Sequence, residues 1–291
     1  MSCSTPKKPN AWQISKRMSE DCQPSAINCV EQPHQVALIL LAHVLQKPKT
    51  WVLAHPETHL NPDQKTQLEQ LVSRLQAGEP LPYLTGKQAF YGLDFAVSPA
   101  VLIPRPETEL LIEEALTWLE AHPGVKHALD VGTGSGCIAV TLATRKPWLA
   151  VTAADLSPAA LEIAKQNAAT HQVDTQIDFQ QADLLSSGVQ TFDLVCANLP
   201  YIPTSKLEEV NTFDFEPTLA LDGGADGLSL IRRLLEQLPQ RLKRPGLVLL
   251  ETEATLGTET LALAKEAFPN ASVSLLQDLA GLDRLVRIEV S

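Results

Sequence analysis

The sequence of 291 residues predicts an α/β protein with a doubly wound sheet and a small N-terminal helical domain. Three observations predict this fold class. Short β-type and helical segments alternate from residue 127 onward, and a glycine-rich turn follows the first expected strand. The first hundred residues instead hold apolar patterns of helical period. We therefore expect two domains of unequal size.

The N-terminal region is expected to be helical after a flexible tail. Residues 1–24 are polar and show no apolar periodicity, which is typical of a tail. Apolar helix patterns occupy residues 36–45 and 61–76, and a shorter helix is expected at 50–54. Residues 25–79 would then form a helical domain, which either packs against the larger domain or recognises a partner.

Residues 80–106 differ in residue composition from the helical segments before them. β-forming and turn residues fill 81–86 and 89–97, which indicates a β-hairpin linker. The following segment, 107–120, is expected to be a helix, because its acidic first turn suits the helix dipole.

The larger domain, residues 107–291, is predicted from its β/α alternation to contain a seven-stranded sheet. We expect helices at 137–145, 158–170, 227–242 and 258–267. Strands are expected at 127–131, 150–154, 176–180, 192–197, 247–251, 272–276 and 284–290. Only seven residues join the last two strands, which is too few for a parallel crossover, so these should form a terminal antiparallel hairpin.

Charge is divided unevenly along the chain, whose formal net charge is −11. Residues 1–100 hold 9 basic and 8 acidic residues, whereas residues 101–291 hold 14 basic and 26 acidic ones. Binding to a nucleic-acid backbone calls for basic patches, so the acidic part argues against a direct nucleic-acid partner.

Several other classes of protein are excluded by the sequence. No apolar run reaches the about 18 residues of a membrane span, and the N-terminus lacks the apolar core of a secretory signal. The five cysteines form no C-x-x-C pair, which is typical of reduced thiols. Pro56 separates His55 from His59, so their spacing does not predict a metal site. We expect a cytoplasmic protein with no membrane partner and no metal.

The sharpest motif is the glycine-rich loop over residues 129–139, between the first expected strand and its helix. Glycines at this point allow a tight turn and a close approach of ligand to backbone. Asp155 stands 19 residues past Gly136, at the end of the second expected strand, where a carboxylate accepts hydrogen bonds from ribose hydroxyls. The G-x-G-x-G spacing, together with Asp130, favours S-adenosyl-L-methionine over a dinucleotide.

Asp183 and Leu184 follow the third expected strand, where this fold usually holds an adenine. Asp183 would lie near the adenine amino group and Leu184 against the ring, although Asp183 could equally cap a helix. The expected cofactor-binding residues are Asp130, Gly132, Thr133, Gly134, Ser135, Gly136, Asp155, Asp183, Leu184 and Asn198.

The tetrad Asn198-Leu199-Pro200-Tyr201 follows the fourth expected strand, at the sheet edge where open α/β sheets bind ligands. The Asn198 side-chain oxygen and the Leu199 carbonyl can each accept one N–H of a planar NH₂ group. The lone pair of the acceptor nitrogen would then point at a sulfonium methyl group, so positioning supplies most of the catalysis. Proline would fix the loop, and the Tyr201 ring offers a stacking face.

With these motifs the sequence resembles the release-factor glutamine methyltransferases, which methylate the glutamine of the Gly-Gly-Gln motif in bacterial-type peptide chain release factors. The resemblance runs from about residue 26 to the C-terminus. Its most specific part is the string Ile-Pro-Arg-Pro-Glu-Thr-Glu at 103–109, which adenine methyltransferases with a similar tetrad do not normally carry. It also includes residues 40–45, 82–86, 97–102, 215–217 and 224–228.

The resemblance implies a Rossmann-like class I methyltransferase domain over 107–291 that uses S-adenosyl-L-methionine, and a monomeric enzyme of EC class 2.1.1. The helical domain at 25–79 would hold the release factor. Asn198, Pro200 and Tyr201 would be catalytic, and the substrate would contact Arg105, Asn198, Leu199, Pro200 and Tyr201. The family's commonest tetrad is Asn-Pro-Pro-Tyr; Leu199 should serve in place of proline, because that position contributes its backbone carbonyl.

Three other functions remain as alternatives. An adenine-N6 methyltransferase acting on DNA or RNA would suit the tetrad, but a flipped base demands a basic groove. An NAD(P)-dependent oxidoreductase would need a dinucleotide fingerprint and a proton-relay residue, and neither is evident. A non-catalytic binding protein is disfavoured by the intact tetrad beside an intact glycine loop.

Overall fold

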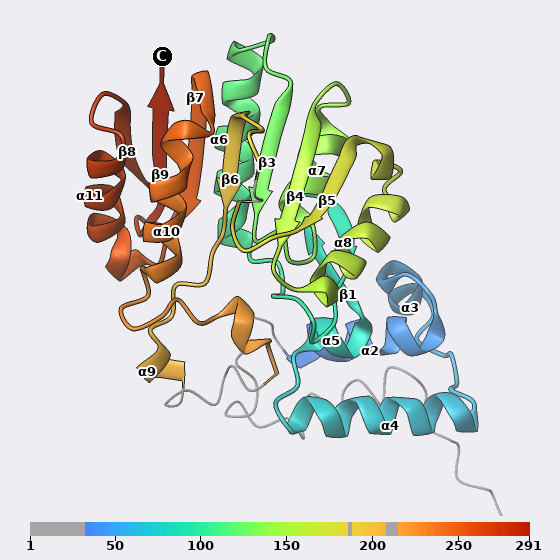
Figure 1. Ribbon diagram of the computed structural model, residues 1–291. Coiled ribbons are helices and arrows are strands. Elements are labelled where there is room, and N and C mark those ends of the chain that lie inside the picture. The colour runs from blue at the N-terminus through green and yellow to red at the C-terminus, as the bar shows by residue number, and fades with distance from the viewer. Residues whose placement is uncertain (1–32, 186–187, 208–214) are drawn as a thin grey trace, which may run out of the picture. The chain divides into compact units, whose positions relative to one another are not determined.

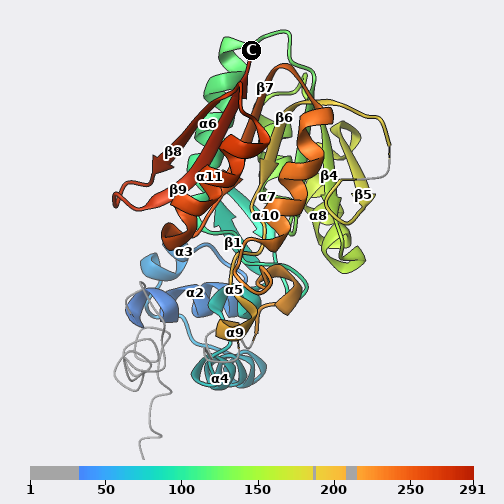
Figure 2. The same cartoon turned by 60° about the vertical axis from the view of Figure 1, so that its left-hand side comes forward.

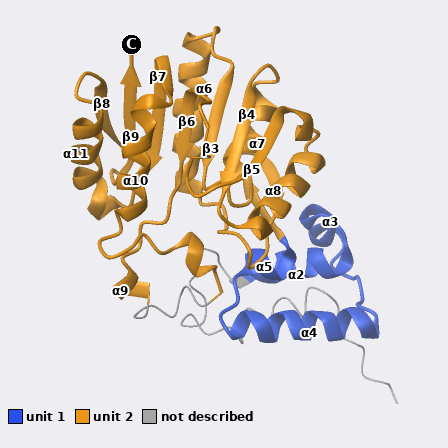
Figure 3. Ribbon diagram, in the orientation of Figure 1, with its two compact units in different colours: residues 1–86 blue, residues 87–291 orange. Residues whose placement is uncertain are grey.

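The computed structural model describes residues 33–185, 188–207 and 215–291. The chain divides into two compact units, Met1–Gly86 and Lys87–Ser291 (Figure 3). The tail expected over 1–24 lies outside the described residues, as does the start of the expected helical domain.

The first unit contains four helices within the described residues: α2 (Pro33–Leu45), α3 (Lys49–Ala54), α4 (Pro62–Gln76) and α5 (Leu81–Thr85). The start of α4 is fixed by a capping box, in which the Asn61 side chain accepts from the Gln64 amide and the Gln64 side chain accepts from the Asn61 amide. The apolar stripe of α4 is buried as its periodicity predicts. The core comprises Val36, Leu38, Leu40, Leu41, Val44, Val52, Leu68, Leu71, Leu75 and Leu84.

The segment expected to be one β-hairpin linker divides into two different structures. Residues 81–85 form the short helix α5 rather than a strand, with Pro82 in its first turn and Gly86 closing it at φ 71°. β1 (Lys87–Phe90) and β2 (Leu93–Ala96) then pair as an antiparallel hairpin. The β-formers in 81–86 were misleading, because proline at a helix start and glycine at its end outweigh weak strand propensity.

The second unit is built on a seven-stranded sheet (Figure 1) in the order β5-β4-β3-β6-β7-β9-β8. The strands are β3 (His127–Val131), β4 (Ala150–Asp155), β5 (Ile177–Gln181), β6 (Phe192–Ala197), β7 (Leu242–Glu251), β8 (Ser272–Gln277) and β9 (Asp283–Val290). The first five are parallel, and β9 runs antiparallel to both β7 and β8. The predicted parallel sheet with a terminal antiparallel hairpin is confirmed.

Alternating strand residues contact different helices, as the period of two in a strand requires. Ala128, Leu194 and Leu247 belong to a core with α6 (Glu109–Ala121), α7 (Cys137–Arg145) and α8 (Pro158–Thr170). Their neighbours Leu129, Val195 and Val248 belong to a core with α10 (Ser229–Gln237) and α11 (Gly257–Ala267). Figures 1 and 2 show α10 and α11 on the sheet face opposite α6 and α7.

Several predicted boundaries differ from the observed ones. The helix expected over 227–242 is α10, which ends at Gln237 and continues as a 3-10 turn, Leu238–Gln240; Pro239 lacks the N–H that a longer helix would need. β7 begins at Leu242 rather than Leu247. The predicted start is too late, because residues 243–246 show none of the apolar alternation by which a strand is predicted. The helix expected from 107 starts with a 3-10 turn, Pro106–Thr108.

Two further expectations concern membranes and thiols. None of the helices in the described ranges is both long and apolar enough to cross a bilayer. Within those ranges the thiols of Cys137 and Cys196 are free.

Candidate functional site

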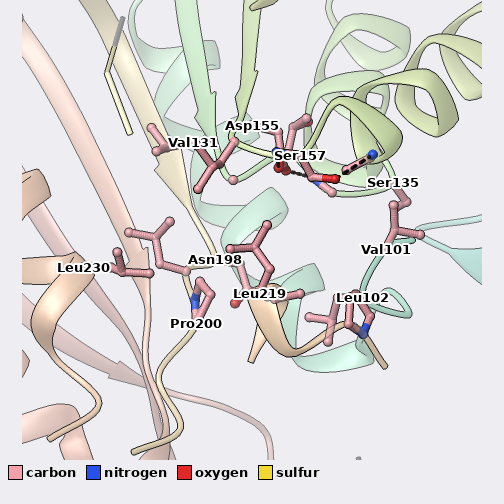
Figure 4. Close-up of a pocket in the computed structure, with 18 of the residues that line it drawn as sticks. Val101, Leu102, Val131, Ser135, Asp155, Ser157, Asn198, Pro200, Leu219 and Leu230 are labelled. Carbon is pink, nitrogen blue, oxygen red and sulfur yellow. Dashed lines mark hydrogen bonds between the residues drawn. The ribbon is translucent and has the colours of Figure 1, made fainter. Parts of the chain in front are cut away.

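A cavity of about 490 Å³ opens at the carboxyl ends of the central strands in the second unit. Its walls come from the glycine loop after β3, the ends of β4, β5 and β6, and two loops, 100–105 and 217–222. Figure 4 shows Asp155 and Ser157 on one side of the pocket, with Asn198 and Pro200 across from them. This is the ligand-binding edge of an open α/β sheet.

The glycine loop has a backbone that only glycine adopts easily at three positions. Gly132, Gly134 and Gly136 have φ of 71°, 54° and 80°. A Cβ on Gly136 would lie 3.0 Å from the Cβ of Ala164 in α8, and one on Gly132 would lie 3.1 Å from Leu199 Cδ2. The loop is therefore shaped by close packing as well as by the turn.

Asp155 ends β4 and lines the cavity with a fixed carboxylate. Its Oδ2 accepts from the Gly134 amide and its Oδ1 from the Ser157 amide, both at 2.8 Å. Partial burial is the main cause of a raised pKa, which these backbone hydrogen bonds oppose. The carboxylate is thus held in place and still borders the cavity, where a ligand hydroxyl could donate to it.

Asp130, by contrast, is fully buried and does not line the cavity. Its Oδ2 accepts from the Thr133 hydroxyl at 2.6 Å and from the Ala139 amide at 3.2 Å. Burial raises its pKa to about 7. Its Oδ1 has no hydrogen-bond partner among the described residues. The side chain therefore holds the glycine loop to the start of α7.

Asp183 and Leu184 also border the cavity, after β5. Leu184 is buried and has a φ of 67°, a strained conformation for a leucine. Asp183 accepts from Arg233 Nη2 of α10 at 2.8 Å. No motif in the sequence predicts Arg233 at this site, because the arginine belongs to an amphipathic helix 50 residues further along the chain.

Asn198 follows β6, and its Nδ2 donates to the hydroxyl of Thr108 at 3.0 Å. Leu199 and Pro200 line the cavity with it. Tyr201 is not among the lining residues; its phenol is partly buried, which raises its pKa to about 12. Of the residues predicted for the site, Asp130, Gly136 and Tyr201 do not border the cavity, whereas the others do.

Arg105 lies in the cavity wall and forms an ion pair with Glu216, which is itself buried. The other oxygen of Glu216 accepts from the Ile103 amide at 3.2 Å. Glu216 therefore joins the loop 100–105 to the segment before 217–222. Sequence reasoning assigned no role to Glu216 or Thr108, although both lie in segments that carried the family resemblance.

The lining suits a neutral or cationic nucleoside better than a pyrophosphate. Its two arginines, Arg105 and Arg233, are each paired with a carboxylate of the same unit. Asp155 borders the cavity without a cationic partner among the described residues. The volume is within the usual range for small-molecule sites, about 300–1,000 Å³. These features fit S-adenosyl-L-methionine, whose sulfonium is a cation.

Comparison with solved structures supports the fold. The structure is similar to the hMettl16 catalytic domain, which was solved in complex with a 3′UTR hairpin. The TM-score is 0.53 at 16% identity, and the match covers 79% of this chain and 83% of that one. It is also similar to a 16S rRNA N2 methyltransferase of T. thermophilus, solved with AdoMet and guanosine, with a TM-score of 0.51, 16% identity and coverage of 70% and 50%. At these identities the likeness concerns the fold alone.

Sequence comparison is more specific. Residues 26–86 match the PrmC N-terminal domain family, and residues 107–213 match the methyltransferase small domain family. The release factor glutamine methyltransferase of Koribacter versatilis is 40% identical over 87% of this chain and 90% of its own. Those of Bacillus anthracis and Geobacter sulfurreducens are 37% and 35% identical, covering 87% and 96% of this chain and 91% and 98% of theirs. The chain belongs to the release factor glutamine methyltransferase family.

Proposed function

We propose that this chain transfers the methyl group of S-adenosyl-L-methionine to the side-chain amide nitrogen (N5) of the glutamine in the Gly-Gly-Gln motif of peptide chain release factors. The observation that carries the proposal is the Asn198 carboxamide at the end of β6. It borders the same cavity as the Asp155 carboxylate, and its Nδ2 is already engaged by Thr108. The curated relatives are named for this reaction.

The residues of the chain position the acceptor nitrogen. With Nδ2 engaged by Thr108, Asn198 is left with Oδ1 to accept one N–H of the substrate amide, and the Leu199 carbonyl would accept the other. When bound, the cofactor supplies an electrophilic methyl group. The new N–C bond would form as the S–C bond breaks; the electron pair of that bond stays on sulfur, which leaves as the neutral thioether, and the nitrogen loses one proton to water. Two acceptors on the NH₂ group raise the electron density on nitrogen and orient its lone pair.

The remaining predicted residues have supporting roles in this proposal. Pro200 would keep the tetrad rigid. Tyr201 lies outside the lining of the cavity, so its ring would pack beside a part of the acceptor that extends beyond the cavity. Arg105, held by Glu216, would form the wall next to the substrate. Asp155 would bind the ribose, and Asp183 with Leu184 the adenine. The helical unit that contains α2 to α5 would recognise the release factor.

Methylation of a glutamine is favoured over methylation of adenine. The lining of the cavity has no unpaired arginine or lysine among the described residues, and residues 101–291 carry 14 basic against 26 acidic residues. A flipped nucleotide would bring its phosphates to that surface. An oxidoreductase is disfavoured because both arginines of the lining are already paired with carboxylates, and the glycine loop has the G-x-G-x-G spacing rather than a dinucleotide fingerprint.

Incubation with labelled S-adenosyl-L-methionine tests the proposal directly. The acceptors would be a release factor, its Gly-Gly-Gln→Gly-Gly-Ala variant, and total RNA and DNA. Label is expected in the first acceptor alone, with mass spectrometry placing the methyl group on the glutamine amide. Equal label in the variant, or label only in nucleic acid, would overturn the assignment of the substrate.

The proposal extends to a monomer that acts in the cytoplasm, where a translation factor would meet it. All described residues that line the cavity come from one unit of one chain, so the site needs no second copy. Sedimentation velocity would measure the oligomeric state of the active protein. Turnover that is confined to a dimeric fraction would contradict the proposed monomer.

A further inference from the structure

The orientation of the Asn198 amide is set by a neighbouring residue in the wall of the same cavity. A carboxamide has one accepting end and one donating end, and only the accepting end can hold a substrate N–H. In the structure the donating end, Nδ2, points to Thr108 Oγ1 at 3.0 Å, across 90 residues of sequence. Thr108 is only 1% exposed, so its hydroxyl is largely shielded from solvent.

The Thr108 hydroxyl has a second partner. It lies close enough to the carboxyl group of Glu251, the last residue of β7, which is 2% exposed, to favour the ionised form of that group. When Glu251 is ionised, its carboxylate can only accept hydrogen bonds, so the single proton of the Thr108 hydroxyl is directed toward Glu251. The lone pairs of Thr108 Oγ1 are then left to accept from Asn198 Nδ2. Burial raises the pKa of Glu251 to about 7, against the opposing effects of Thr108, Arg284 and Arg105, so the ionised form prevails above about pH 7.

We propose that Thr108 and Glu251 are positioning residues, which fix the side-chain amide of Asn198 with its oxygen toward the acceptor nitrogen. The inference rests on the proposed function. If the amide turned by 180°, its NH₂ group would face the NH₂ group of the substrate, and two donors would oppose each other. Glu251 accepts the proton of Thr108, and Thr108 Oγ1 accepts from Asn198 Nδ2. Thr108 therefore has no proton left to donate to the Asn198 oxygen, which opposes that turn.

The first test compares Thr108→Val with Thr108→Ser in the full-length protein. Thr108→Val keeps the shape of the side chain and removes the hydroxyl, so kcat for release-factor methylation is expected to fall about 10- to 100-fold. The dissociation constant of S-adenosyl-L-methionine should change little, whereas the melting temperature should fall modestly, because Asn198 Nδ2 loses its partner. Thr108→Ser restores the hydroxyl and should recover most of the lost kcat.

Thr141→Val is the matched control. Thr141 is also fully buried, but its hydroxyl has no hydrogen-bond partner among the described residues and does not border the cavity. The same chemical change at this position should leave kcat unaltered. A fall equal to that of Thr108→Val would show that loss of any buried hydroxyl impairs the enzyme, and would overturn the inference.

Glu251 is tested by the same logic. Glu251→Gln keeps an oxygen that can accept from Thr108 and should retain more activity than Glu251→Leu, which has no acceptor. If Glu251→Leu unfolds, circular dichroism will show it, and the comparison then rests on Glu251→Gln and on the Thr108 variants. Equal activity of the two folded Glu251 variants would contradict the proposed chain.

A double-mutant cycle separates positioning from general damage. If Thr108 acts through Asn198, Thr108→Val should have no further effect on kcat in an Asn198→Ala background. A full additional loss in that background would refute the inference. Wild-type protein that fails to methylate the release factor would refute the proposed function instead, whereas active wild type with an equally active Thr108→Val variant would refute only the positioning role.

Discussion

The backbone amide of Gly134 donates to Asp155 Oδ2 at 2.8 Å, which joins the glycine loop after β3 to the carboxylate that ends β4. The two motifs were separate in the sequence analysis, but they form one structure. The carboxylate holds the loop through a hydrogen bond within the chain, so the site is built on the ends of neighbouring strands.

Replacement of Asp155 should weaken cofactor binding before it affects methyl transfer. Asp155→Ala removes both the predicted ribose acceptor and the bond to Gly134, so the dissociation constant of S-adenosyl-L-methionine should rise about 10- to 100-fold in calorimetry. When the cofactor concentration is raised to saturation, the turnover rate of the variant should approach that of the wild type. Asp178→Ala, which removes an exposed carboxylate from β5, is the control. Unchanged affinity in Asp155→Ala would refute the ribose contact.

Asn198→Ala should have the opposite effect. The variant loses the acceptor oxygen for the substrate amide, and kcat should fall by about 100-fold or more, as for removal of a preorganised transition-state hydrogen bond. Cofactor affinity in calorimetry should stay within about threefold of wild type. Parallel losses of affinity and turnover would contradict the role assigned to the side chain.

Glu216→Ala should loosen the wall of the cavity. Glu216 is buried and binds both the Arg105 side chain and the Ile103 amide, so its loss leaves two donors unsatisfied. We expect about 1–3 kcal/mol less stability in urea unfolding, together with a higher KM for the release factor. Asp226→Ala breaks a surface pair with Arg232 and should change stability far less. Equal losses of stability in the two variants would show that the contacts of Glu216 with Arg105 and Ile103 contribute no more than a surface ion pair does.

Gly136 should tolerate no side chain. Its φ is 80°, and an added Cβ would lie 3.0 Å from Ala164 Cβ and 3.2 Å from Ala164 Cα. Gly136→Ala should therefore cost about 1–3 kcal/mol in unfolding free energy. Gly124 has open space around the position of a Cβ and a φ outside the left-handed region, so Gly124→Ala should be nearly neutral. A neutral Gly136→Ala would mean that α8 can move away from the loop.

The buried Asp130 should make stability depend on pH. Its pKa is raised from 3.8 to about 7 in the folded state, because burial disfavours the charge. Between these pH values the folded protein binds more protons than the unfolded chain, so the unfolding free energy falls as pH rises and levels off above about 7. Glu251, whose pKa is also raised to about 7, acts in the same direction.

Asp130→Asn isolates the contribution of Asp130. The asparagine oxygen can still accept from Thr133 and Ala139, and its NH₂ group would replace the unpartnered Oδ1. Without cofactor, wild type should lose up to about 3 kcal/mol relative to Asp130→Asn between pH 5 and pH 8, since one proton is worth ~1.4 kcal/mol per pH unit. Urea unfolding across this range measures the difference. Parallel pH profiles for the two proteins would contradict a buried charge.

Local patterns predicted most of the larger unit correctly. The expected strands at 127–131 and 192–197 and helices at 137–145 and 158–170 have the observed bounds, because apolar period and glycine or proline boundaries act within a few residues. The errors fall where those signals conflict. The start of α5 follows its local proline and glycine signals rather than the β-forming residues between them, whereas the polar first half of β7 takes its structure from the strands that it pairs with.

The motif residues, their order and their place at strand ends were determined by the sequence itself, since the turn after β3 needs glycine and the edge of a parallel sheet gathers strand ends. Only the tertiary structure decided which distant groups complete them. Thr108 lies 90 residues before Asn198, and Glu216 lies 111 residues after Arg105. Such pairs leave no periodic trace in the sequence, because a hydrogen bond needs two atoms within about 3 Å and places no condition on the chain between them.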